Sequence, residues 1–274
     1  MTRTDIANLA LSLIGGSPVA SIDDPTSQAR ACKKWFDSVR DEALASHPWN
    51  FAMKRAIITP WWRSVALITN DGDNINVVSA SGYHNLPPGS RVHVRGVRGM
   101  EAANGTWLIE GSESNLVLIG SVFSGAAVPW TGQWTQAPTF GWEYELALPT
   151  DCLRVCGVNA SDAAEDDSDF YVLEGGKLLF QEEEAHLSYV SRVAEPTGWP
   201  PEFCNAFALL LASFIAQELM GPTGRAMELR QQYESVISPK IKGRDARQGK
   251  GPRVPMSHDC DVIRARRGGA ATNA

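Results

Sequence analysis

The residues best suited to chemistry form an acidic stretch, DAAEDDSD, at positions 162–169. Hard cations such as Ca²⁺ take several carboxylate oxygens as ligands, so one interpretation of this stretch is a calcium site. The stretch lacks the glycine and the distal bidentate glutamate of an EF-hand loop, which favours a solvated loop instead. A second acidic run, Gln181–Glu184, falls between two predicted strands. It indicates either a polar turn or an acidic patch that repels nucleic acid.

Catalytic residue types are present but lack a catalytic context. No GxSxG, HExxH, P-loop or GxGxxG motif occurs, and the five histidines are widely scattered. The five cysteines include no CxxC pair, and Cys152 and Cys156 lie roughly 13 Å apart on a predicted strand, too far to bridge. We therefore expect reduced thiols, no metal, no cofactor and no enzymatic activity.

Tryptophans are the other residues that could bind a ligand. Exposed aromatic rings stack on sugars or nucleobases, so a carbohydrate-binding module is one hypothesis. The alternative, which we favour, is that they pack the seam where both ends of a β-rich segment meet the rest of the chain. The five that flank or end this segment are Trp61, Trp62, Trp130, Trp134 and Trp142.

Composition limits the class of protein. The chain is 43% hydrophobic and 20% charged, as in ordinary soluble globular proteins. Its longest apolar run, around residues 207–216, is too short to span a bilayer, and its N-terminus lacks the features of a signal peptide. We expect no membrane partner and synthesis in a cytoplasm.

The periodicity of the sequence predicts an α+β fold in four parts. Residues 1–59 hold two helices and a first strand, and residues 139–242 hold an antiparallel β-sheet module and two more helices, so that four main helices form a bundle. Short β-rich runs separated by turn signals predict an inserted all-β domain over residues 60–138. Residues 243–274 show little periodicity and are expected to form an extended basic tail.

A helix breaks abruptly within RDEALASHPWNFAMKR, residues 40–55. Pro48 stops the helix because proline disfavours the α conformation for the residue before it. We interpret His47, Pro48, Trp49 and Phe51 as a structural hinge between the helices and the sheet. Trp49 and Phe51 are expected to plug this junction.

Four blocks of sequence, in this order, carry a resemblance to a known family. They are NLALSLIGGSPVASIDD, RDEALASHPWNFAMKRA, YELALPTDCLRVCGV and YVSRVAEPTGWPPEFCNAFALLLASFIAQEL. Through them the chain resembles phage tail tubular protein A, the head-to-tail adaptor family of short-tailed phages. The segment 60–138 departs from simple members of that family. It is similar to small β-modules of other phage structural proteins through VRGMEAANGTWLI followed by LVLIGSVFSGA.

The resemblance implies a structural virion protein without catalysis, assembled in the host cytoplasm and located at the head–tail interface. Such a protein forms a dodecameric ring that joins the portal protein ring to the tail nozzle, with DNA passing through its channel without specific binding. We expect the inserted domain to dock tail fibres or spikes. Two other functions stay open: a carbohydrate-binding protein resting on the tryptophans, and a DNA-binding head-completion factor using the basic tail.

The charge of the chain is unevenly distributed. The net charge is −6, but from Lys242 to the end there are eight Lys and Arg residues against three Asp, so the remainder holds about −11. A basic tail with apolar anchors on an acidic body is expected to dock on the portal or a neighbouring subunit. The residues assigned to this docking are Arg244, Arg247, Arg253, Val262, Ile263, Arg264, Arg266 and Arg267.

Overall fold

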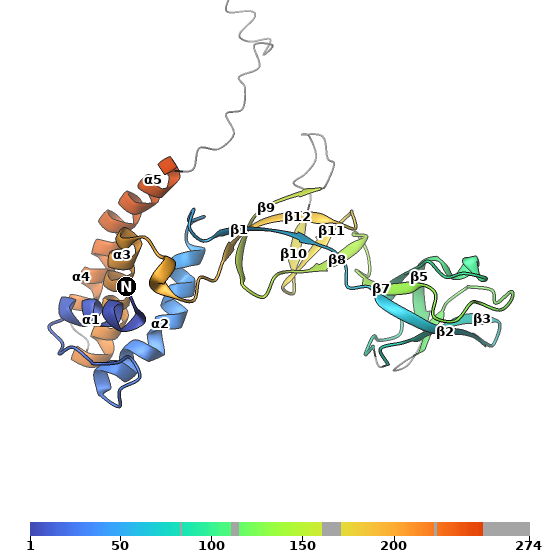
Figure 1. The fold of residues 1–274 in the computed structure, drawn as a ribbon, viewed down its shortest axis with the longest axis horizontal. Coiled ribbons are helices and arrows are strands. Elements are labelled where there is room, and N and C mark those ends of the chain that lie inside the picture. The colour runs from blue at the N-terminus through green and yellow to red at the C-terminus, as the bar shows by residue number, and fades with distance from the viewer. Residues whose placement is uncertain (83, 111–114, 161–170, 222–223, 249–274) are drawn as a thin grey trace, which may run out of the picture. The chain divides into compact units, whose positions relative to one another are not determined.

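The computed structural model describes residues 1–82, 84–110, 115–160, 171–221 and 224–248 (Figure 1). Its helices and three antiparallel sheets confirm the predicted α+β class. By contacts the chain divides into two compact units. The helical unit comprises Met1–Met53 with the chain from Arg192 onward, and the β unit comprises Lys54–Ser191.

This division differs from the predicted parts, which grouped the sheet with the helices in one core of residues 1–59 and 139–242. The sheet strands share a hydrophobic cluster of their own, which includes Ile58, Leu146, Val158 and Leu187. The division by contacts places these strands in the β unit together with residues 60–138, although the described members of their cluster include no residue of that segment.

The helical unit begins with two capped helices. Thr2 and Asp5 form a reciprocal capping box at the start of α1 (Arg3–Leu13). Thr26 caps α2 (Ser27–Ala45), whose apolar residues at spacings of three and four are buried. A short 3₁₀ helix, Pro196–Gly198, leads into α3 (Pro201–Met220).

The helix α3 is the centre of this unit. Of the helices in the described parts of the chain, it alone is long and apolar enough to cross a membrane by length and composition. Two thirds of its apolar window (67%) is buried inside the unit, as expected of a core helix. Phe203 and Phe207 on α3 pack with Phe36 and Trp199 into an aromatic cluster.

The C-terminal helix extends further than the sequence suggested. The segments α4 (Gly224–Gln232), a π-helical turn (Tyr233–Ile237) and α5 (Ser238–Gln248) follow one another without a break. The prediction that the extended tail begins at residue 243 is therefore wrong for residues 243–248. Tertiary contacts explain the difference, because Ile241 is buried and Arg244 forms an ion pair with Glu202 of α3.

The β unit contains two small sheets outside the inserted domain. One has the order β1 (Met53–Ile58), β12 (Ala185–Ser191) and β9 (Cys152–Ala160). The other has the order β10 (Val172–Glu174), β11 (Lys177–Phe180) and β8 (Tyr144–Ala147).

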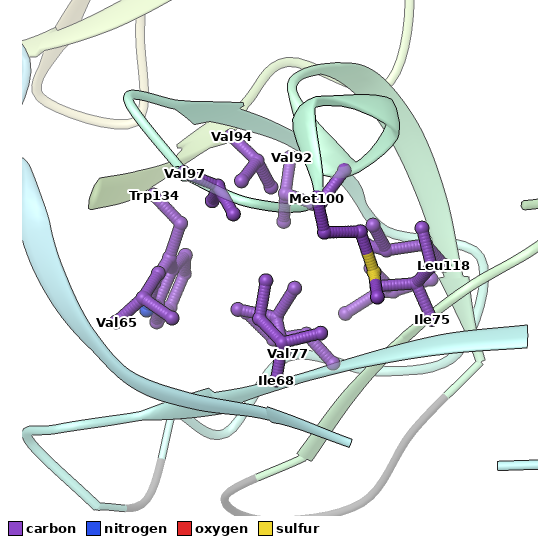
Figure 2. Close-up of a cluster of buried hydrophobic side chains, with 13 residues drawn as sticks. Val65, Ile68, Ile75, Val77, Val92, Val94, Val97, Met100, Leu118 and Trp134 are labelled. Carbon is purple, nitrogen blue, oxygen red and sulfur yellow. The ribbon is translucent and has the colours of Figure 1, made fainter. Parts of the chain in front are cut away.

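The remaining six strands close into a barrel within residues 63–137. In barrel order they are β2 (Arg63–Asp71), β3 (Asn74–Ser79), β6 (Asn115–Leu118), β5 (Gly105–Glu110), β4 (Arg91–Arg95) and β7 (Gln133–Ala137). A 3₁₀ turn, Glu101–Ala103, precedes β5. Closure leaves no free sheet edge among these strands. Figure 2 shows side chains from opposite walls, such as Val77 and Val92, directed into a common interior.

Candidate functional site

The predicted hinge is a buried structural anchor in the helical unit. Trp49 is only 2% exposed, and its indole Nε1 donates a hydrogen bond to the carbonyl oxygen of Ala43 at 3.0 Å, in the last turn of α2. Its ring meets Phe203 of α3 edge-on, with 5.0 Å between centroids, and His47 at 4.8 Å. Phe51 also packs edge-on against Phe203, at 5.0 Å. The turn after Pro48 therefore holds two aromatic side chains, Trp49 and Phe51, against Phe203 in the first turn of α3.

An acidic residue of α5 clamps the same turn. The backbone N–H of Asn50 donates to both carboxylate oxygens of Asp245, at 3.2 and 3.1 Å. The Asn50 side-chain amide donates to the Asp245 carbonyl oxygen at 2.5 Å, and His47 Nε2 lies 3.4 Å from the same carboxylate. The Asp245 side chain is 11% exposed, whereas Asn50 lies at the surface. Sequence reasoning placed Asp245 in the tail; a lone acid within the basic run KIKGRDAR was the available signal.

Two of the five predicted seam tryptophans take part in contacts between the barrel and the strands that flank it. Trp62 Nε1 donates to Glu183 Oε1 at 2.9 Å, while Arg95 of β4 stacks over the Trp62 ring at 3.6 Å and forms an ion pair with the same carboxylate. Trp142 contributes its carbonyl oxygen, which accepts a hydrogen bond from Arg91 at 2.7 Å.

A second set of contacts joins β4 to the segment that leads out of the barrel. Both carboxylate oxygens of Glu143 accept hydrogen bonds from Arg91 Nη2, at 2.9 and 2.8 Å. His93 lies 2.5 Å from the Glu143 carbonyl oxygen through Nε2, so Nε2 must carry the proton there. Its other ring nitrogen, Nδ1, lies 2.8 Å from the Thr106 hydroxyl.

Arg91, His93 and Arg95 form one row, which we call the β4 polar row. Residues two apart on a strand point to the same face, so the row lies on the outer wall of the barrel and the alternate residues Val92 and Val94 fill its core. This row was not predicted, although the alternation R-V-H-V-R in the sequence was a signal for it.

The other three predicted seam tryptophans lie elsewhere. Trp134 is fully buried in the barrel core, so its assignment to the seam is wrong (Figure 2). Trp61 and Trp130 expose 75% and 74% of their surface. The guanidinium of Arg63 lies 4.8 Å from the rings of both Trp61 and Trp134, and thus stacks between them. The apolar character of a tryptophan does not reveal whether its side chain faces the interior of a barrel or the solvent.

Only one of the two acidic runs lies within the described residues. The stretch 162–169 lies outside the described residues. In the second run, Gln181 donates to the Gly141 carbonyl oxygen at 3.0 Å and Glu183 binds Arg95, so this run is more than a polar turn. Over the described part of the chain, no group of three or more His, Cys, Asp or Glu side chains is arranged to hold a metal ion.

Of the residues assigned to docking, two lie within the described part of the chain. Arg244 forms its ion pair with Glu202, and Arg247 is exposed in the last turn of α5. The remaining six lie outside the described residues: Arg253, Val262, Ile263, Arg264, Arg266 and Arg267.

A groove of about 960 Å³ between α3 and α4 is the kind of hollow where an active site could lie. Several of its polar side chains are already engaged: the hydroxyls of Ser213 and Ser235 donate to helix carbonyl oxygens, each at 2.6 Å. Arg230 forms ion pairs with Glu42 and Glu234. The arrangement provides no nucleophile paired with a base. Burial likewise raises the pKa of the Cys32 thiol to about 11, which keeps it protonated and unreactive.

No protein-family model matches the chain, and no curated protein matches it either.

Proposed function

We propose that the chain is the head-to-tail adaptor of a short-tailed phage, a non-enzymatic ring subunit that joins the portal ring to the tail nozzle. The observation that carries the proposal is the resemblance of four ordered sequence blocks to phage tail tubular protein A. The second block, RDEALASHPWNFAMKRA, contains the turn in which Trp49 is buried and Asn50 is clamped. Trp49 and Asn50 of this block thus have structural roles, as expected of a virion component.

The physical task of an adaptor suits these features. A ring subunit must transmit force between portal and tail without deforming, and a turn held by buried aromatic rings and a shielded carboxylate is rigid. The acidic body suits the wall of a DNA channel, because weak repulsion lets DNA slide without specific binding. The closed barrel would then be an added module for tail fibres or spikes, held by the β4 polar row.

Mixing with portal protein tests the proposal directly. Mass photometry of the purified chain, alone and with the portal of the same phage, should show the portal particle gaining one discrete increment that corresponds to a ring of subunits. A portal particle of unchanged mass, with the chain remaining monomeric, would refute the adaptor function.

A truncated variant tests whether the C-terminal tail docks on the portal. Truncation after Gln248 removes residues 249–274 but keeps Arg244 and the Asp245 clamp. If the tail docks on the portal, this variant should lose the added mass or show it only at higher concentration. A truncated chain that binds portal as the full chain does would show that the tail docks elsewhere.

A carbohydrate-binding function is the second candidate, and the exposure of Trp61 and Trp130 favours it. Binding of a glycan by the full chain, lost when either ring is replaced by alanine, would support it. DNA binding through the tail predicts a steep loss of DNA affinity with salt, abolished by the truncation after Gln248.

A further inference from the structure

Trp130 occupies a backbone position that suits another residue type. It lies in a Pro129–Trp130 turn with φ of +60°, in the left-handed region that glycine or asparagine normally fills. A bulky side chain is disfavoured there because its Cβ approaches the neighbouring carbonyl oxygen. The ring is 74% exposed, so little burial compensates within the chain. Folding alone therefore does not account for a tryptophan at position 130.

The turn is held firmly in place. The backbone N–H of Trp130 donates to the Ala66 carbonyl oxygen of β2 at 3.0 Å. The Thr131 hydroxyl donates to the Val128 carbonyl oxygen at 2.6 Å and accepts the N–H of Arg98 at 3.2 Å. Val128 in turn donates to the Arg98 carbonyl oxygen at 2.8 Å. An aromatic ring presented on a fixed backbone loses little conformational freedom on binding, which favours recognition.

The neighbours of the turn make a surface that we call the Trp130 surface: Leu67, Arg98, Val128 and Trp130. Leu67 follows Ala66 on β2 and is 43% exposed, and Val128 is 51% exposed. Arg98 is exposed, and its guanidinium forms no ion pair with a carboxylate of the described residues. Of these four residues, Trp130 and Arg98 are the types that are enriched at the hot spots of protein–protein interfaces.

The chemistry of this surface favours a protein over a saccharide. Sugar sites combine an aromatic ring with polar side chains placed around it to fix the hydroxyls. The segments that hold the turn, residues 66–67, 97–99 and 128–132, offer the polar side chains of Arg98 and Thr131, and the Thr131 hydroxyl is already engaged. Gln133, which follows the turn, accepts a hydrogen bond from Arg95 at 3.4 Å. Glu101 lies nearby, but its carboxylate accepts the backbone N–H of Gly99 at 3.1 Å.

We infer that the Trp130 surface docks another protein of the tail, one that offers an apolar pocket for the indole ring and a carboxylate for Arg98. This inference rests on the proposed function for the identity of the particle, and on the Trp130 turn for the site. It assigns the interaction to one face of the barrel, on the side where β2 meets the turn.

Hydroxyl-radical footprinting followed by mass spectrometry tests the inference, because the oxidation rate of an indole reports its exposure to solvent. Trp61 is the matched control, since it lies in the same unit and is 75% exposed against 74% for Trp130. In purified particles of the phage that encodes the chain, oxidation of Trp130 should fall at least about fivefold relative to the free chain, as for a buried hot-spot residue. The ratio of Trp130 to Trp61 oxidation should fall with it.

The variant Trp130→Gly links the site to a partner. Supplied to a phage that lacks its own copy, the variant should enter particles normally, while one tail protein present in wild-type particles is lost. Trp61→Ala should leave the particle composition unchanged. The thermal midpoint of the Trp130→Gly chain should equal or exceed that of the wild type, which excludes misfolding as the cause.

Other results overturn the inference in distinguishable ways. Unchanged Trp130 oxidation in particles, or a complete set of tail proteins with Trp130→Gly, refutes the docking site and leaves the adaptor function standing. Absence of the chain from particles refutes both. A glycan that binds the wild-type chain and fails to bind Trp130→Gly replaces the protein partner with a saccharide.

Discussion

Trp49 offers the sharpest test of what holds the helical unit together. The substitution Trp49→Ala deletes a side chain that is 2% exposed and removes its edge-on contacts with Phe203 and His47. Replacing a buried large aromatic residue by alanine destabilises a domain by about 3–5 kcal/mol, because apolar burial is lost and a cavity remains. We expect the upper part of this range only if the turn cannot collapse onto Phe203.

The variant Trp49→Phe separates packing from hydrogen bonding. It keeps a ring against Phe203 but removes the indole donor to the Ala43 carbonyl oxygen. That carbonyl also accepts the Ser46 hydroxyl at 2.8 Å, so it keeps a partner in the variant. The expected loss is therefore about 1–2 kcal/mol, combining one ordinary hydrogen bond with a smaller ring. Trp61→Ala, at a 75% exposed site, should change the free energy of unfolding by less than about 0.5 kcal/mol.

Urea denaturation followed by far-UV circular dichroism, which reports mainly on helices, measures these differences. The two units need not unfold together, so the helical transition is analysed by itself. With a denaturant slope of about 1–3 kcal/mol per molar urea, a loss of about 4 kcal/mol lowers its midpoint by about 1–4 M. Equal losses for Trp49→Ala and Trp49→Phe, or a Trp49→Ala midpoint within error of Trp61→Ala, would refute the buried-anchor role.

Three further predictions concern the β unit. In a double-mutant cycle of Arg95→Gln and Glu183→Gln, the coupling free energy should be about 0.5–1 kcal/mol. The value is small because both side chains are more than a third exposed to solvent. As the control, Glu182→Gln should show no coupling to Arg95. A hydrogen bond from Lys54 holds the pKa of Asp151 below its ordinary value of 3.8. The stabilisation by this carboxylate is therefore complete above that value and disappears as the pH falls through the lower folded-state pKa. Asp151→Asn should lower the free energy of unfolding by about 0.5–1 kcal/mol at neutral pH, and the difference should vanish at pH values below the folded-state pKa of Asp151. A difference that does not change with pH would contradict this dependence of stability on the ionisation of Asp151. Trp130→Gly should raise the free energy of unfolding by about 1 kcal/mol in thermal melts by relieving the left-handed backbone, an effect that Trp130→Ala should not reproduce.

Local patterns were enough to predict the helices and the class of fold. In α2 the residues Ala29, Cys32, Phe36, Val39 and Ala43, chosen by their spacing alone, are all buried. The turn signals between residues 60 and 138 likewise predicted short strands, six of which the structure joins in a barrel. These features follow from the sequence because helical and strand periodicities place side chains on faces within a few residues.

Contacts between residues far apart in the sequence required the tertiary structure. Asn50 and Asp245 are 195 positions apart, and Arg95 and Glu183 are 88 apart, so no local pattern pairs them. The same limit explains why residues 243–248 of α5 were assigned to the tail, since Arg244 and Asp245 have their partners in distant segments. Which tryptophan is buried was also undetermined: Trp134 fills the barrel core while Trp61 stacks outside on Arg63, because chain closure assigns the faces. The sequence by itself determined where the elements lie and which surfaces are apolar. Only the three-dimensional packing, which sets the distance between charges and rings, decided which side chains act together.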